Sequence, residues 1–198
     1  AIPFEEPYKK VQDVVRYLRR ALEGEKIKDD FDTFSINGFK LGALPTEPVP
    51  ILVAALRSGM LKLAGREGDG GIINWLSAED VSTVAPIVQD ASTDGSPKEV
   101  VARIFCAPID DPDTVYGAAK FAIAAYLNVP VYRAFHEWLG REELQGMWDA
   151  WDAGDRKAAL EASPTSVVDE LIVHGPPEKC REQIQRYIDN GVTTPALA

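Results

Sequence analysis

The residues best suited to chemistry form a short turn between an apolar strand and an amphipathic helix. The turn consists of Ala54, Ala55, Leu56, Arg57, Ser58, Gly59 and Met60. The first amides of a helix have no acceptor within the helix, and the helix dipole adds about half a positive charge there. Ser58 can cap the helix or bond a phosphate oxygen, Gly59 lets the backbone approach, and Arg57 offers a forked cation. On the pattern alone an ordinary strand-to-helix turn is favoured over a phosphate site, because the turn is poor in glycine.

The elements around this turn are predicted to form a βαβ unit. Residues 49–55 are almost continuously apolar, which is typical of a parallel strand covered on both faces. Apolar residues at helical spacing follow from Met60, and Gly65 and residues 68–71 are expected to end that helix. Residues 72–75 are strand-like again. Ligands bind where the strands of such a unit end, so function is expected at this turn.

Composition narrows the class of protein. The chain has 198 residues, is 45% hydrophobic and carries a formal net charge of −10, which suits one well-packed domain over residues 1–198 and argues against nucleic acid as a partner. No apolar run is long enough to span a membrane and no signal peptide is evident, so a cytoplasmic protein is expected. Cys106 and Cys180 lack metal-like spacing to either histidine and are interpreted as reduced core thiols.

Further elements follow from periodicity and turn residues. Val11, Val14, Val15, Leu18 and Leu22 are expected to form one face of a first helix that ends near Gly24. Asn37 and Gly38 predict the turn of a hairpin, an insertion over about residues 32–42. Residues 77–80 resemble a capping box that opens a helix through about Ala91, and residues 100–107 form a third apolar strand.

The second half of the chain is predicted to be largely helical, with a helical insertion over about residues 128–172. Three aspartates around Pro112 are interpreted as helix-capping carboxylates rather than as metal ligands, and no metal is expected; they are Asp110, Asp111 and Asp113. The aromatic stripe of residues 144–151 is interpreted as core rather than as a cofactor site. A short helix is expected from Ser163 and Pro164, and the last helix from Pro177 to Gly191. Residues 192–198 are predicted to form a fourth strand. The inward residues of the last helix are expected to be Cys180, Ile184, Tyr187 and Ile188.

The two histidines receive structural interpretations. His136 lies on an amphipathic helix and is expected to be half-buried or on the surface. His174 precedes a helix start and is expected to lie away from the strand ends. Neither has a nearby serine or cysteine at a spacing that suggests a nucleophile.

Alternating strands and helices permit an open doubly wound sheet or a (β/α)8 barrel. About four strands are predicted, whereas a barrel needs eight in about 250 residues, so the count fits half a barrel. The chain opens at Ala1 directly before a helix and stops within an apolar strand. We therefore expect it to be part of a larger protein.

Several segments resemble the luciferase-like monooxygenase family. Residues 53–76 resemble the central signature of that family, and residues 173–180, followed by Tyr187 and residues 190–192, resemble its penultimate helix and the approach to its last strand. Residues 103–108 and 125–132 resemble the branch that uses the deazaflavin coenzyme F420. The resemblance covers nearly the whole chain and corresponds to the C-terminal half of the family's barrel.

This resemblance implies a TIM-type α/β barrel that binds a flavin-like ring at the carboxyl ends of its strands and moves a hydride to or from it. The turn at residues 54–60 would hold the cofactor phosphate. Asn74 and Trp75 would border the ring or the substrate, and Cys106 and Ala107 would close the third strand end. F420 is the expected cofactor, with FMN as the alternative, and a small organic molecule is the expected substrate.

The resemblance also has departures. The family turn usually carries more glycine, which weakens the phosphate assignment. The lysine of the family's sugar-phosphate dehydrogenases is missing from residues 75–78, so a phosphorylated sugar is not the expected substrate. The strands that carry the usual acid and base residues have no counterpart here, so the catalytic residues are unknown.

Three hypotheses follow. The first is an F420-dependent oxidoreductase, expected to form a homodimer and to require the N-terminal half of the barrel. The second is a non-catalytic half-barrel that assembles with a partner through its unpaired strand edges. The third, another phosphate-binding TIM barrel such as a sugar-phosphate enzyme, is weakened by the lack of a lysine or a carboxylate pair at the strand ends.

Overall fold

The computed structural model describes residues 5–198 and divides into two compact units. The first unit comprises Ala1–Ile72 and Ile87–Glu99, and the second comprises Ile73–Pro86 and Val100–Ala198. Residues 1–4, the predicted entry into the first helix, lie outside the described residues. Within residues 5–198 no helix is both long and apolar enough to cross a membrane. The prediction of one domain over residues 1–198 stays a prediction.

The first unit begins with helix α1 (Pro7–Leu22), which confirms the first predicted helix and carries proline in its first turn, where no amide hydrogen is needed. Its buried side differs in part from the predicted face, because Val14 is exposed while Val15 and Asp13 are buried. The Asp13 carboxylate accepts hydrogen bonds from the amide (2.9 Å) and the hydroxyl (2.8 Å) of Thr33. The buried side of α1 therefore includes an anchored carboxylate that the predicted apolar face did not contain.

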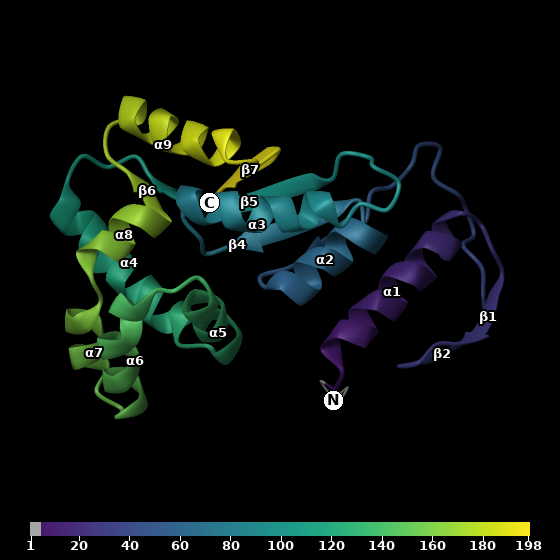
Figure 1. Cartoon of the computed structure of the whole chain (residues 1–198), viewed down its shortest axis with the longest axis horizontal. Helices are drawn as coiled ribbons and strands as arrows, with labels where there is room; N and C mark the ends of the chain where they lie inside the picture. The colour runs from purple at the N-terminus through teal and green to yellow at the C-terminus, as the bar shows by residue number, and fades with distance from the viewer. Residues whose placement is uncertain (1–4) are drawn as a thin grey trace. The chain divides into compact units, whose positions relative to one another are not determined.

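Strands β1 (Ile27–Asp30) and β2 (Ser35–Phe39) pair antiparallel as a hairpin beside α1 (Figure 1). The predicted turn is wrong, because Asn37 and Gly38 lie within β2, and the turn falls at residues 31–34. The register places Ile27 opposite Phe39 and the next residue opposite Asn37, so Gly38 is the extra residue of a β-bulge. Its φ of 87° is a conformation that glycine adopts readily, and the Asn-Gly pair therefore marks the bulge rather than the turn.

The predicted βαβ unit is confirmed. Strand β3 (Leu52–Ala54) leads through α2 (Ser58–Glu67) to β4 (Gly70–Asn74), and the two strands pair parallel. Gly65 lies inside α2 rather than at its end. A Cβ at Gly65 would lie 2.0 Å from the carbonyl oxygen of Val88, so glycine is needed here for close packing.

The second unit contains three strands in parallel pairing. Strand β5 (Glu99–Ala107) pairs with β6 (Ile172–His174) and with β7 (Thr194–Leu197). The sequence does not predict β6, because its three residues are all buried and follow a helix without a loop. The described residues thus hold five strands in parallel pairs, one more than expected.

The remaining helices confirm the predicted helix that opens at residues 77–80, the largely helical second half and the helices after Ser163 and from Pro177. The helix over residues 156–162 is not predicted separately. The bounds of these helices are α3 (Ala78–Asp90), α4 (Pro112–Leu127), α5 (Pro130–Trp138), the 3-10 helix η1 (Glu142–Leu144), α6 (Gln145–Asp152), α7 (Arg156–Ala162), α8 (Thr165–Leu171) and α9 (Pro177–Asp189). The capping box of α3 is confirmed: the Ser77 amide donates to Asp80 Oδ2 (2.8 Å), and the Asp80 amide donates to Ser77 Oγ (3.1 Å).

Helices α4 to α8 pack against one another in the second unit (Figure 1). Met147 and Trp148 of α6 are buried in this cluster, and the indole Nε1 of Trp148 donates to the carbonyl of Leu127 (3.0 Å), which confirms these two residues of the aromatic stripe as core. On α9, Cys180 and Tyr187 are buried as predicted. Ile188 is exposed, contrary to the prediction.

Candidate functional site

The predicted phosphate turn lies in the first unit, between β3 and α2. Arg57 occupies the N-cap position with extended backbone, and Ser58 is the first helical residue. The helix's hydrogen bonds begin with Leu61 N, which donates to the Arg57 carbonyl (3.0 Å), so the amides of Ser58, Gly59 and Met60 precede the first intrahelical bond. Ser58 stands one residue past the N-cap and does not cap this helix, so of its two predicted roles the contact with a phosphate oxygen stays a prediction.

This helix end is accessible to an anion. Nothing lies within 4 Å of the position that a Cβ would take on Gly59, and Gly59 is exposed. The Arg57 side chain is also exposed and, in residues 5–198, forms no ion pair with a carboxylate. Ala54 is exposed at the end of β3, whereas the buried Ala55 donates its amide to Ile72 O (2.9 Å). The residues present therefore fit a phosphate group at this turn.

Asn74 and Trp75 lie in the second unit, at the carboxyl end of β4. Trp75 has a φ of 55°, a left-handed conformation that is uncommon for a residue other than glycine and tends to occur at functional sites. Its side chain is 1% exposed and packs against the rings of Phe105 (4.1 Å between centroids) and Tyr126 (5.1 Å). The buried indole therefore packs directly against the Phe105 ring.

Polar atoms at the same strand end lack hydrogen-bond partners. Asn74 Nδ2 donates to the Tyr132 hydroxyl (3.1 Å), while Asn74 Oδ1 and Trp75 Nε1 are buried without a partner. Leaving such an atom unsatisfied costs about 1–3 kcal/mol. These two atoms therefore mark a place where a polar group from outside the described residues would be stabilising.

His136 of α5 is fully buried, so the prediction of a half-buried or surface histidine is wrong. Within residues 5–198 neither ring nitrogen forms a hydrogen bond of ordinary geometry, and the Trp75 backbone is the polar group that acts on the ring. Burial and the nearby Arg141 guanidinium lower the pKa of His136 to about 4, which keeps the ring neutral. Arg141 is itself buried and donates to Asp80 (2.6 Å) and Glu170 (2.5 Å). The helical pattern could not reveal this buried charge, because Asp80 and Glu170 are distant in sequence.

Cys106 and Ala107 end β5, as predicted. Cys106 is half-buried, its amide donates to Ala198 O (2.9 Å), and burial raises the pKa of its thiol. Cys180 is buried and donates from Sγ to the carbonyl of Gly175 (3.3 Å). Both cysteines are free thiols, as expected, although Cys106 is only partly in the core.

His174 is located differently from the prediction. It is the last residue of β6 and lies opposite Ala107 in the parallel register, at a strand end. Its Nε2 lies 2.9 Å from Asp169 Oδ1, which also accepts a hydrogen bond from the Tyr116 hydroxyl (2.9 Å). The expected position of His174 away from the strand ends is wrong, because the sequence does not predict β6, which places His174 at a strand end.

Two residues of β5 that sequence reasoning did not assign to the site are Arg103 and Phe105. The guanidinium of Arg103 lies 4.5 Å from the centre of the Phe105 ring. The alternation of residues along β5 is the pattern that could have placed them on one face with Ala107. The described residues contain no group of three or more histidine, cysteine or carboxylate side chains that could hold a metal ion.

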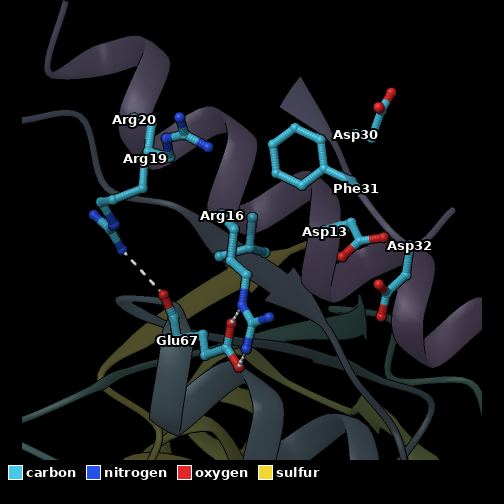
Figure 2. A pocket seen from close by; sticks show the side chains of 9 residues that line it. Asp13, Arg16, Arg19, Arg20, Asp30, Phe31, Asp32 and Glu67 are labelled. Carbon is cyan, nitrogen blue, oxygen red and sulfur yellow. Dashed lines mark hydrogen bonds and ion pairs between the residues drawn. The ribbon is translucent and has the colours of Figure 1, made fainter. Parts of the chain in front are cut away.

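A cavity of about 580 Å³ lies elsewhere in the first unit, and none of the predicted site residues lines it. Figure 2 shows the guanidinium of Arg16 facing the carboxylate of Glu67, with hydrogen bonds of 2.7 and 3.0 Å. Arg19 bonds Asp69, and Arg20 bonds two further carboxylates. The cavity is lined by Asp13, Val15, Arg16, Arg19, Arg20, Asp30, Phe31, Asp32 and Glu67. Because its arginines are already paired, we assign this cavity no ligand.

A family model described as luciferase-like monooxygenase matches residues 1–194. The chain belongs to the luciferase-like monooxygenase family. It is 28% identical over 97% of its length to the 5,10-methylenetetrahydromethanopterin reductase of Archaeoglobus fulgidus, of which it covers 60%. It is 23% identical over 96% of its length to the F420-dependent glucose-6-phosphate dehydrogenase of Mycobacterium tuberculosis, of which it covers 54%. The chain thus spans little more than half the length of these curated relatives.

Solved structures confirm the fold. The coenzyme F420-dependent tetrahydromethanopterin reductase of Methanopyrus kandleri superposes with a TM-score of 0.78 at 18% identity, covering 96% of this chain and 57% of that one. The oxygenating constituent of 3,6-diketocamphane monooxygenase of Pseudomonas putida, in complex with FMN, gives a TM-score of 0.56 at 16% identity, covering 94% and 55%. The prediction of an α/β chain that supplies about half of a TIM-type barrel is therefore confirmed.

Proposed function

We propose that this chain is part of an oxidoreductase that transfers a hydride between coenzyme F420 and a small organic substrate. The observation that carries the proposal is the similarity, over nearly the whole chain, to relatives whose names include F420. When bound, the deazaflavin supplies the hydride chemistry, so the protein's part is binding, orientation and exclusion of water.

The chain's own residues suggest how this work is divided. The amides of Ser58, Gly59 and Met60 and the exposed Arg57 would hold the cofactor phosphate, since they combine unpaired donors with a free cation. In the second unit, Asn74 and Trp75 would border the ring or the substrate. Their unpartnered Oδ1 and Nε1 atoms supply one acceptor and one donor at that border.

Cys106 and Ala107 would close the neighbouring strand end. The raised pKa of Cys106 keeps its side chain an uncharged thiol at neutral pH, which suits a wall rather than a nucleophile. The cytoplasm is the compartment that we propose for a protein with two free thiols.

Replacing Ser58 by Asp tests the phosphate turn. A carboxylate there would repel a bound phosphate, and we expect F420 affinity to fall by about a hundredfold or more, measured by calorimetric titration. Ser166→Asp is the matched control, because it adds the same charge in the first turn of α8 and should leave F420 binding unchanged. Equal affinity in the wild type and Ser58→Asp would remove this turn from the cofactor site.

FMN is the alternative cofactor, favoured by the likeness to an FMN-bound monooxygenase structure. Parallel titrations with F420 and FMN separate the two, and binding of FMN alone would overturn the F420 assignment.

A non-catalytic half-barrel that assembles with a partner is the second candidate function, since the chain covers little more than half of its relatives. Sedimentation of the purified chain tests this, as well as the proposed homodimer: a stable monomer that turns over substrate would exclude both.

A further inference from the structure

Arg103 is an exposed residue in the middle of strand β5. Along this strand Val100, Ala102 and Ile104 are at most 1% exposed, whereas Arg103 between them is exposed. Successive residues of a strand point to opposite faces, and in a (β/α)8 fold the face away from the helices lines the barrel interior. Arg103 therefore brings a positive charge to the interior face.

The Arg103 guanidinium has a defined position. It lies 4.5 Å from the centre of the Phe105 ring, two residues nearer the carboxyl end of the strand. Phe105 in turn packs at 4.1 Å on Trp75, which is buried. The stack therefore holds the cation toward the strand end at which barrels of this type bind ligands.

Comparison within the chain distinguishes Arg103 from other arginines that lie over aromatic rings. Arg20 and Arg133 each bond two carboxylates, and Arg156 donates to the carbonyl of Trp151 (2.6 Å). Arg103 has no hydrogen-bond acceptor or carboxylate partner in residues 5–198. The exposed Arg103 guanidinium is therefore available to pair with an anion from outside these residues.

We propose that Arg103 binds a carboxylate or phosphate group of the small molecule that this face receives. The planar guanidinium offers two parallel N–H donors to two oxygens of such a group, and the Phe105 ring provides an apolar surface beside it. The proposal rests on the proposed function, because it identifies the bound molecule as an anion. The anionic group belongs either to the cofactor or to the substrate.

Proton–nitrogen NMR of the arginine Nε–H groups tests this in the 198-residue chain. Arg103→Met identifies the Arg103 signal, and inorganic phosphate is then titrated in. We expect a saturable shift of the Arg103 signal, while Arg156, assigned with Arg156→Met, does not respond. Arg103→Lys keeps the charge and should retain weaker phosphate binding, and urea unfolding confirms that each variant is folded.

Repeating the titration with saturating F420 separates the two sources. If bound F420 blocks the phosphate response and Arg103→Met weakens F420 binding at least tenfold, the anionic group is on the cofactor. If the response persists with F420 bound, the site is left for an anionic substrate. No shift of the Arg103 signal, or a shift without saturation that records an adventitious ion only, overturns the proposal. If the wild type binds neither F420 nor FMN, the proposed function fails, and the phosphate titration alone still decides the role of Arg103.

Discussion

His136 links the stability of the second unit to pH. Its ordinary pKa of 6.5 falls to about 4 in the folded chain, because the ring is buried beside the Arg141 guanidinium, with Asp80 opposing the effect only in part. The unfolded chain therefore binds the proton more readily than the folded one. The stabilisation is complete above pH 6.5, declines as the pH falls and is lost near pH 4, a difference of roughly 3 kcal/mol.

Urea unfolding at pH 7, 5.5 and 4 measures this effect. We expect the wild type to lose roughly 3 kcal/mol more than His136→Gln over that range, since the variant has no titrating ring. Other groups titrate equally in both proteins and cancel in the comparison. Parallel stability curves for the two proteins would contradict the assignment.

Arg141 is expected to be the most costly charged residue to remove. Its guanidinium is 7% exposed and bonds Asp80, whose side chain is 14% exposed, as well as the more exposed Glu170. Arg141→Met would leave the Asp80 carboxylate buried without its cation, and we expect the free energy of unfolding to fall by about 3 kcal/mol. Glu143→Gln removes only a 3.7 Å partner that is 43% exposed and should cost less than about 1 kcal/mol. Equal costs in chemical denaturation would refute this ranking.

At the scale of elements, two helical glycines allow a matched test of packing. Alanine at Gly65 gains helix propensity of about 1 kcal/mol, but its Cβ would lie 2.0 Å from the Val88 carbonyl oxygen, so we expect a net loss of about 1–3 kcal/mol. Gly117 of α4 has nothing within 4 Å of that position, and Gly117→Ala should stabilise the chain by about 0.5–1 kcal/mol. Denaturation midpoints measure the stability change of both variants. A stabilising Gly65→Ala would show that α2 and α3 can move apart at this contact without cost.

The elements that the sequence predicted correctly are those with local causes. The βαβ unit follows from apolar runs and glycines, and the start of α3 follows from the reciprocal bonds of Ser77 and Asp80. The errors arise where pairing with a strand distant in the sequence determines the local structure. The bulge at Gly38 exists only because β1 lies opposite it, and β6 is a strand because β5 lies beside Ile172 and His174. Neither is visible in a local window.

The candidate site likewise has a part that follows from local sequence and a part that depends on tertiary packing. The turn around Arg57 could be predicted because strand, turn and helix are contiguous in the sequence. The cluster around Trp75 could not, because Phe105, Tyr126 and Tyr132 come from separate elements. The helical pattern likewise does not show that His136 is buried.

At the scale of the whole molecule, cofactor binding can be measured as an increase in stability. A ligand that binds only the folded chain raises the free energy of unfolding, by about 2.7 kcal/mol at a concentration a hundred times its Kd. We therefore expect F420 at that excess to raise the urea midpoint, followed by circular dichroism, while FMN at the same concentration raises it less. Ser58→Asp should lose the F420 effect yet unfold like the wild type without ligand, since Ser58 makes no capping bond in α2. A larger stabilisation by FMN would assign the chain to the FMN-dependent members of its family, and stabilisation by neither would favour the non-catalytic half-barrel.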